Sequence, residues 1–464
     1  MNNEWKSGLS RRSFMRTLGA ASVAATSYPA FAALQQAPAA GARRAQAQAA
    51  QGGGGGDFGD MTNDPLMVKI SSNENPLGPS DAARVAIAKV GAEGGRYNQQ
   101  YKSEVVTVFS QQFGLKTAPA GGGGGMRGAR PAPGTPAAAA AAVSAAAGGG
   151  RMGGDSYVTL YPGSGGALDL AVYSSLLNGK DLVVGEPGYE QGPSAGAKMK
   201  VNVHRVPLLP NGAMDVKGML AASNNIGAFY LCNPNNPTGT MTPKSDIVWL
   251  ANNMPADAIL IVDEAYHHFS PDESSIDLVA ADKNVIVLRT FSKVYGMAGL
   301  RAGFFIAKPE LQHKVALIGA GAGTGTGAGS VAISTAAACT ASLSDPKLIP
   351  ARRKINADIR ENVLEWMDKN GYGYYKGSQA NFFQADVKRP GREFSTLMRA
   401  EHVAIGRTWA AMPNYVRVTI GTQEEMDKFK VAYKKCYETA PLPASAYLDT
   451  PFVENPSELY RHLA

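Results

Sequence analysis

Short apolar runs alternate with helical patterns through the middle of the chain. The runs predict buried strands at 181–185, 228–232, 259–262, 285–288 and 303–307. The intervening patterns predict helices at 166–178 and 243–253, the second with Thr242 as N-cap and Pro243 at its first helical position. Strands that alternate with helices predict an α/β fold, in which a mostly parallel sheet is covered on both faces.

The pattern changes after residue 345 to longer helices separated by single strands. It predicts a helix at 351–370, strands at 381–385 and 415–420, and a further helix between the strands. We expect these elements to form a smaller α+β domain from residues 61–105 and 345–464. The larger domain then takes residues 106–344.

Three segments are rich in glycine and alanine and cannot bury apolar surface. Residues 33–60 predict a flexible linker, and residues 118–154 predict a disordered surface insertion in the larger domain. Residues 319–329 alternate Gly with Ala and Thr. This patch contains a GxGxxG-like string but no preceding strand, so we do not expect a dinucleotide site there.

Composition excludes several classes of partner. Of the 464 residues, 44% are apolar, which is enough for a sizeable core. The net charge is +7, and residues 1–32 carry four basic residues and one acidic residue, so the rest of the chain has a charge of +4. This mild excess predicts no nucleic-acid groove. The three cysteines have no metal-ligand spacing, and neither a metal site nor a disulfide framework is expected.

The N-terminus carries an export pattern. Ser10-Arg11-Arg12-Ser13-Phe14-Met15 is similar to a twin-arginine signal, an apolar stretch follows at 18–28, and Ala30-Phe31-Ala32 fits a cleavage site. The stretch is too short to form a stable membrane anchor. We expect residues 1–32 to be removed and the mature protein to work outside the cytoplasmic membrane.

Polar motifs follow three successive predicted strands. These motifs are NPNNPTG at 233–239, DEAY at 263–266 and RTFSK at 289–293. In an open parallel sheet, ligands bind beyond the carboxyl ends of the strands. The three strand ends would therefore bring an amide, a carboxylate with a phenol, and an amine to one cleft.

These side chains match the requirements of pyridoxal-phosphate (PLP) chemistry. Asp263 can keep the pyridine nitrogen protonated, while Asn236 and Tyr266 can donate to the phenolic oxygen of the ring. Lys293 can bind the cofactor covalently and move a proton, so Lys293, Asp263 and Tyr266 are the expected catalytic residues. A phosphate needs a helix N-terminus and a cation. Its candidate contacts are Gly165, Gly166, Ala167, Thr290, Ser292 and Arg301.

Further motifs occur in the order of a known family. In chain order these are SNENPLGP at 72–79, Arg96-Tyr97, EPGY at 186–189, NPNNPTG, DEAY, TFSKVYGMAGLRAG at 290–303 and YVRVTIGT at 415–422. With them the chain resembles the fold-type I PLP-dependent aminotransferases of class I/II, and among these the histidinol-phosphate aminotransferase-like group. The resemblance covers residues 66 to 435, apart from the insertion.

The resemblance implies an aspartate aminotransferase-like fold with a seven-stranded sheet, PLP as cofactor, and a homodimer. It implies amino transfer between an amino acid, or a histidinol-phosphate-like amine, and a 2-oxo acid. Tyr189 would stack on the cofactor ring, and Tyr97 would reach the phosphate in the neighbouring subunit. Arg417 would bind the substrate carboxylate, with Arg407 and Asn75 as further substrate contacts.

The chain departs from the group at two places beside the site. Ala167-Leu168 replaces the usual Asp-Glu pair, and the patch at 321–329 replaces a Pro-aromatic-Asn segment. The resemblance therefore implies PLP chemistry but not histidinol phosphate itself. A lyase or decarboxylase on this scaffold and a non-catalytic PLP or amino-acid-binding module remain alternatives. For His267-His268 we expect a structural or substrate-lining role, because adjacent side chains point apart.

Overall fold

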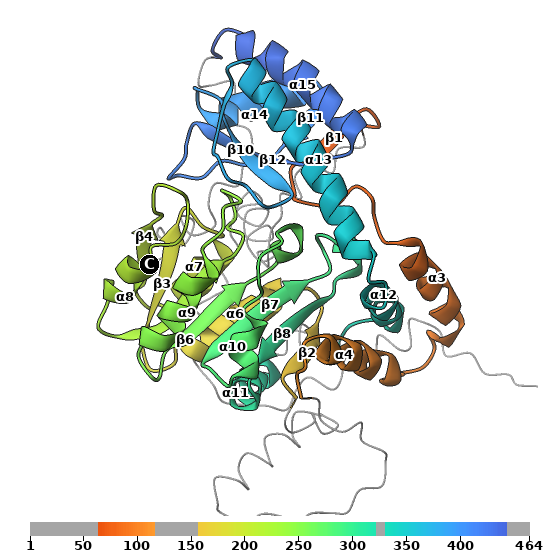
Figure 1. The fold of residues 1–464 in the computed structure, drawn as a ribbon, viewed down its shortest axis with the longest axis vertical. Coiled ribbons are helices and arrows are strands. Elements are labelled where there is room, and N and C mark those ends of the chain that lie inside the picture. Colours follow the sequence, from red (N-terminus) through yellow and green to blue (C-terminus); the bar gives the residue numbers. More distant parts are fainter. Residues whose placement is uncertain (1–63, 117–155, 322–329, 443–464) are drawn as a thin grey trace, which may run out of the picture. The chain divides into compact units, whose positions relative to one another are not determined.

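The computed structural model describes residues 64–116, 156–321 and 330–442 (Figure 1). The expected signal at 1–32, the linker at 33–60 and the insertion at 118–154 lie outside these ranges. Most of the patch at 319–329 does so as well. These expectations remain predictions.

A seven-stranded sheet forms the centre of the larger part. Its strands, in spatial order, are β2 (Val158–Tyr161), β8 (Gly303–Ala307), β7 (Val285–Thr290), β6 (Ile259–Asp263), β5 (Ile226–Cys232), β3 (Asp181–Glu186) and β4 (Val203–Pro207). Only β8 runs antiparallel to its neighbours. The predicted α/β fold with a mostly parallel sheet is confirmed. The two edge strands, β2 and β4, were not predicted, because edge strands lack the continuous apolar run of a central strand.

Burial explains the apolar runs. Every residue of β5, β6, β7 and β8 is buried, so helices must cover both faces of the sheet. The helices that accompany the strands are α6 (Gly165–Ser175), α7 (Gln191–Lys198), α8 (Val216–Ala221), α9 (Lys244–Asn253), α10 (Ile276–Ala280) and α11 (Pro309–Gly321).

Two predicted helices have different ends in the structure. Helix α9 begins one residue later than expected, because Pro243 has an extended ψ of 141° and is itself the N-cap. Helix α6 ends at Ser175 rather than at Asn178, whose φ of 67° is left-handed and incompatible with a continuing helix.

The smaller hydrophobic core lies around two small sheets. Strands β12 (Tyr415–Thr419), β10 (Phe382–Asp386) and β9 (Gly373–Tyr374) are antiparallel, and β1 (Val68–Ile70) pairs in parallel with β11 (Val403–Ile405). Helices α13 (Leu348–Lys369), α14 (Gly391–Ala400) and α15 (Gln423–Glu438) pack on them. Figure 1 shows α13 extending from beside α14 and α15 to α12 (Ile333–Leu343).

Residues 61–105, which were expected to belong to the smaller domain, are divided between the two cores. Within residues 64–105, the part of this segment that the structure describes, only β1 joins the smaller core. Helices α3 (Asp81–Val90) and α4 (Gln100–Gln112) pack against α12, and their buried residues Ala83 and Val105 belong to the larger core. The expected boundary at residue 105 therefore does not coincide with the division between the cores, because the apolar faces of α3 and α4 are covered by α12.

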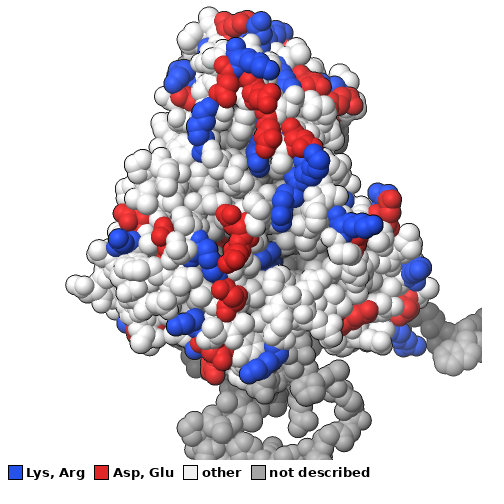
Figure 2. Space-filling model, in the orientation of Figure 1, with Lys and Arg blue, Asp and Glu red and all other residues white. Residues whose placement is uncertain are grey.

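The described surface and core show three general features. Basic and acidic side chains are intermingled on the face shown in Figure 2. Cys232, Cys339 and Cys436 are buried free thiols. Among the helices within the described ranges, none is long and apolar enough to cross a membrane.

Candidate active site

Three adjacent strands of the sheet deliver polar groups to one edge. Strands β5, β6 and β7 are neighbours, so the segments that follow their carboxyl ends lie together. These segments carry Asn236 after β5, Asp263 and Tyr266 at the end of β6, and Lys293 after β7. The expectation that strand ends would gather these side chains matches the sheet order.

Lys293 is a partly buried amine without a carboxylate partner among the described residues. Its Nζ donates to the carbonyl oxygen of Ser72 (3.3 Å) and lies 5.4 Å from the centroid of the Tyr266 ring. Burial, together with the nearby Arg417 guanidinium, lowers the pKa of Lys293 to about 8. About one tenth of the amine is therefore neutral and nucleophilic at pH 7, far more than for an ordinary lysine.

Asp263 is buried and accepts hydrogen bonds from neutral groups. The Tyr230 hydroxyl donates to its Oδ2 (3.2 Å) and the backbone N–H of Ala265 donates to its Oδ1 (3.1 Å). Burial raises the pKa of Asp263 to about 6, although both hydrogen bonds oppose that rise. Tyr230 was missed in the sequence, because it stands inside the apolar run of β5 and has the pattern of a core residue.

The Tyr266 hydroxyl joins residues that are far apart in the chain. It accepts from Nδ2 of Asn73 (3.0 Å) and from Nδ2 of Asn236 (3.4 Å). Burial raises the pKa of Tyr266 well above its ordinary value. Asn73 is a second residue that the sequence analysis missed. Only its place in the motif at 72–79 indicated a role for that segment.

Arg417 lies on β12 and connects the smaller core to the site. Its Nη1 donates to Oδ1 of Asn236 (3.0 Å) and its Nη2 to the carbonyl of Ser71 (2.6 Å). Its buried Nε has no partner among the described residues. Burial lowers the pKa of Arg417 to about 10, so it stays charged at neutral pH. Asn236 thus contacts both Tyr266 and Arg417.

A second group of polar atoms lies where α6 begins. Oγ1 of Thr290 bonds Oγ of Ser292 (3.0 Å), which also accepts from Nη1 of Arg301 (3.3 Å). The Arg301 guanidinium lies against Gly163, where an added Cβ would be 2.3 Å from Nη2. Glycine at 163 therefore allows the cation to approach the loop before α6. Of the expected loop residues, Gly165 and Gly166 open this helix, whereas Ala167 is fully buried.

The remaining expected residues lie away from this arrangement or are already paired. The hydroxyl of Tyr189 donates to Oε1 of Gln191 (3.1 Å), and Arg407 forms an ion pair with Glu190. Tyr97 is fully exposed. These three side chains contact none of Lys293, Asp263 or Tyr266 through the hydrogen bonds of the described residues.

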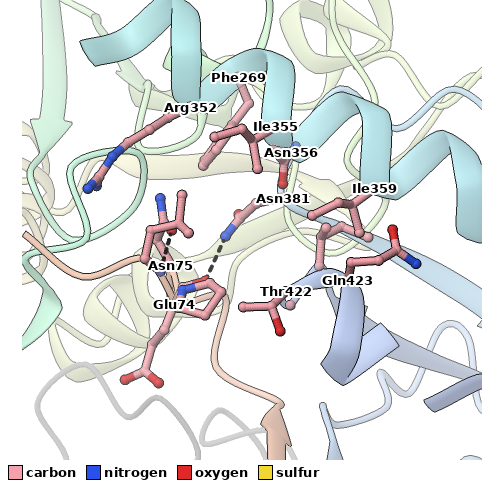
Figure 3. Close-up of a pocket in the computed structure, with 14 residues that line it drawn as sticks. Glu74, Asn75, Phe269, Arg352, Ile355, Asn356, Ile359, Asn381, Thr422 and Gln423 are labelled. Carbon is pink, nitrogen blue, oxygen red and sulfur yellow. Dashed lines mark hydrogen bonds between the residues drawn. The ribbon is translucent and has the colours of Figure 1, made fainter. Parts of the chain in front are cut away.

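Asn75 lines a separate cavity of about 220 Å³ (Figure 3). The cavity lies between residues 74–77, α13 and the start of α15. Nδ2 of Asn75 donates to the carbonyl of Val294 (3.0 Å), and Nδ2 of Asn381 donates to the carbonyl of Glu74 (3.1 Å). The side chain of Asn75 therefore contacts the residue after Lys293 rather than the residues expected to bind substrate.

The residues that are present fit a PLP-sized ligand. The buried carboxylate of Asp263 suits a protonated ring nitrogen, and the paired amides around Tyr266 suit a ring oxygen. The Arg301 guanidinium, packed against Gly163 just before α6, suits a phosphate, and the unpartnered Nε of Arg417 suits a carboxylate.

Comparison with known proteins decides the family. The family described as aminotransferase class I and II matches residues 127–431. This chain belongs to that family. It is a PLP-dependent aminotransferase, and PLP is its cofactor.

Curated relatives of this aminotransferase share most of its length. It is 26% identical over 368 residues to a histidinol-phosphate aminotransferase of Bacillus licheniformis, covering 78% of this chain and 89% of the relative. It is 29% identical over 373 residues to that of Symbiobacterium thermophilum, covering 79% and 90%.

A solved structure shares the fold. The histidinol-phosphate aminotransferase of Sinorhizobium meliloti, in complex with pyridoxal-5′-phosphate, superimposes with a TM-score of 0.64 at 20% identity. The match covers 89% of this chain and 98% of the other.

Proposed function

We propose that this aminotransferase moves the amino group of an α-amino acid to a 2-oxo acid, with Lys293 as the residue that binds PLP covalently. The observation that carries this proposal is the partly buried Lys293 amine, next to Tyr266 and without a carboxylate partner among the described residues. Bound PLP supplies an electron sink for the bond that breaks at the substrate α-carbon. The Lys293 amine takes the proton from that carbon, as its lowered pKa allows.

The other residues hold the reactants in place. Asp263 carries the negative charge that keeps a ring nitrogen protonated, and Tyr266 with Asn236 orients the ring oxygen. Ser292 and Arg301, with the N-terminus of α6, would bind the phosphate. Tyr189 would hold the face of the ring.

Arg417 binds the substrate carboxylate. Its Nη atoms are held by Asn236 and Ser71, which fixes the direction of the guanidinium. Its unpartnered Nε is among the donors that remain for a substrate. Ala167-Leu168, where the group usually has Asp-Glu, favours an amino acid over the histidinol phosphate in the relatives' names.

Two measurements test this function. Borohydride reduction of the purified enzyme followed by peptide mapping should place the pyridoxyl group on Lys293, and labelling of another lysine would contradict the assignment. A panel of amino donors and 2-oxo acids should show transfer that depends on both. Carbon dioxide release without any requirement for a 2-oxo acid would instead indicate a decarboxylase.

The same proposal includes a homodimer in which Tyr97 reaches the partner's cofactor site. Tyr97 is fully exposed, and Val85 and Leu77 of the same segment at 64–116 are exposed as well, which suits a surface that another subunit covers. Mixing inactive Lys293→Ala and Tyr97→Phe subunits should restore part of the activity, because one of the mixed sites has both residues. A monomer in light scattering would contradict the dimer.

We also propose export through the twin-arginine route, with the mature chain beginning near Ala33. The motif at 10–15 and Ala30-Phe31-Ala32 support it, and this route carries folded proteins that already hold a cofactor. Replacing Arg11 and Arg12 by lysine should retain the precursor in the cytoplasm, because lysine lacks the planar guanidinium. An uncleaved wild-type protein found wholly in the cytoplasm would refute the proposal.

A further inference from the structure

Arg407, which the family resemblance assigned to a substrate anion, is already neutralised within the chain. Its Nη2 lies 2.5 Å from Oε2 of Glu190, and the two side chains are only 13% and 5% exposed. Such a short, sheltered contact is a charge-assisted hydrogen bond and not a solvated surface pair. Glu190 thus occupies a donor edge of Arg407 that a substrate anion would need.

Trp409 joins this pair to the proposed carboxylate site. The guanidinium of Arg407 lies 4.8 Å from the Trp409 ring centroid, and that of Arg417 lies 5.3 Å from it. Nε1 of Trp409 donates to the carbonyl of Gly188 (3.1 Å), which ties the ring to the segment that carries Tyr189 and Glu190. Both cations and Glu190 therefore belong to one buried cluster.

The charges of this cluster balance with a single substrate anion. Arg407 and Arg417 contribute two positive charges and Glu190 one negative charge, which leaves one positive charge. The α-carboxylate of an amino acid neutralises it at Arg417. A second anion on the same substrate would have to displace Glu190 or lie beside it in a buried environment, where like charges repel strongly.

We infer that Glu190 is a specificity-determining residue that restricts the enzyme to amino acids and 2-oxo acids whose side chains carry no negative charge. This inference rests on the proposed function, since it takes Arg417 as the site of the α-carboxylate. It names the substrate class as monocarboxylic amino acids with uncharged side chains. Dicarboxylic and phosphorylated amino acids are excluded by the pairing of Arg407.

The test compares pairs of amino donors in which one member has an anionic side chain and the other an uncharged one. The full-length, PLP-saturated enzyme is assayed with L-glutamate against L-glutamine, L-aspartate against L-asparagine, and O-phospho-L-serine against L-serine. We expect kcat/KM for the uncharged member of each pair to be at least about tenfold higher, which is the effect of removing one charge-assisted hydrogen bond. A wild-type preference for the anionic members would overturn the inference.

The variant Glu190→Gln sharpens this test. It keeps the shape of the side chain but frees the charge of Arg407, so the anionic-to-neutral ratio of kcat/KM should rise about ten- to a hundredfold. Glu190→Asp, which retains the carboxylate, should return the ratio towards the wild-type value. An equal fall for both members of each pair would show that Glu190 only supports the fold, and would overturn its role in specificity.

Glu186→Gln is the matched control. Glu186 forms an ion pair with Arg205, also 2.5 Å long, four residues before Glu190, but this pair lies outside the cluster around Trp409. Its loss should not change the ratio. A similar shift in the control would mean that any break in this segment alters selectivity, which contradicts a specific role for Glu190.

Failure of the inference can be distinguished from failure of the proposed function. If no donor is turned over, the amino-acid assignment itself is wrong. The charge selectivity is then decided by binding, with butyrate and glutarate titrated against the absorbance of the bound cofactor. Tighter binding of butyrate would support the role of Glu190, and tighter binding of glutarate would refute it.

Discussion

Two neighbouring carboxylates at the end of β6 have opposite electrostatic properties. Asp263 and Glu264 are equally well buried, with 4% and 2% of their surfaces exposed. Burial raises the pKa of Asp263 to about 6. Its hydrogen-bond partners are neutral and offset only part of this rise. Burial would also raise the pKa of Glu264, but Arg289 and several hydrogen bonds outweigh that effect and lower it.

The partners of Glu264 form a closed network. Its carboxylate accepts from Nε of Arg289 (2.7 Å) and from the backbone N–H of Ser275 (2.6 Å). Nη1 of Arg289 bonds Nε2 of His268 (2.8 Å), so the histidine has a structural contact. Both carboxylates are therefore buried, and the groups around each one decide whether its role is reactive or structural.

The largest expected effect is a loss of turnover when Lys293, which belongs with Asp263 to the candidate active site, is replaced. Lys293→Ala should lose at least about 10⁴-fold in turnover, because the covalent attachment and the proton transfer depend on the same amine. Lys244→Ala is the control, since Lys244 bonds the carbonyl of Ser274 on the Glu264 side. Single-turnover kinetics of both variants test this. Comparable losses would mean that the residues around Glu264 affect turnover as much as those around Asp263.

Asp263→Asn should separate activity from stability. Turnover should fall about 10²- to 10⁴-fold without the charge that keeps the ring nitrogen protonated. The folded pKa of about 6 exceeds the ordinary 3.8, so the stability that this group contributes is present below pH 3.8 and is lost as the pH rises through 6.

The difference between the folded pKa of Asp263, about 6, and the ordinary 3.8 corresponds to roughly 3 kcal/mol of unfolding free energy. The cofactor-free Asn variant should therefore be more stable than wild type at pH 8, and the gain should shrink at pH 5. Urea unfolding of both proteins at the two pH values measures it. A variant less stable at pH 8 would show that Asp263 is not strained by burial.

Glu264→Gln should show the reverse behaviour. It leaves the Arg289 charge buried without its partner, which should cost about 3–5 kcal/mol of unfolding free energy while covalent PLP attachment persists. The lowered pKa means that the stability from Glu264 is present above pH 4.5 and is lost as the pH falls through its folded pKa. The difference between variant and wild type should therefore narrow in acid. If the variant kept its stability at pH 7 but lost covalent PLP attachment, Glu264 would have the reactive role and not the structural one.

The smallest effect is expected for Tyr230→Phe. Removing the hydroxyl takes one hydrogen bond of 3.2 Å from Asp263 and should weaken equilibrium PLP binding up to about tenfold. Titration of the cofactor-free protein measures this without any turnover. Tyr157→Phe is the control, because the Tyr157 hydroxyl bonds Asp282 instead. Equal changes in both variants would mean that the Tyr230 hydroxyl has no specific effect on the site.

Local pattern determined much of the architecture and of the strand-end chemistry. Continuous apolar runs can be buried only in the middle of a covered sheet, which is why the central strands followed from the sequence. Parallel strands end at one edge, so the motifs after β5, β6 and β7 were expected to meet there. The short edge strands β2 and β4 have no such pattern and became visible only in the structure.

Tertiary structure alone decided which groups contact those motifs. Asn73 reaches Tyr266 across 193 positions, and Arg407 pairs with Glu190 across 217. Tyr230 has the pattern of a core residue, yet its hydroxyl bonds Asp263. Hydropathy and local motifs carry no information on such distances, because pairing and pKa depend on what the fold places within a few ångströms.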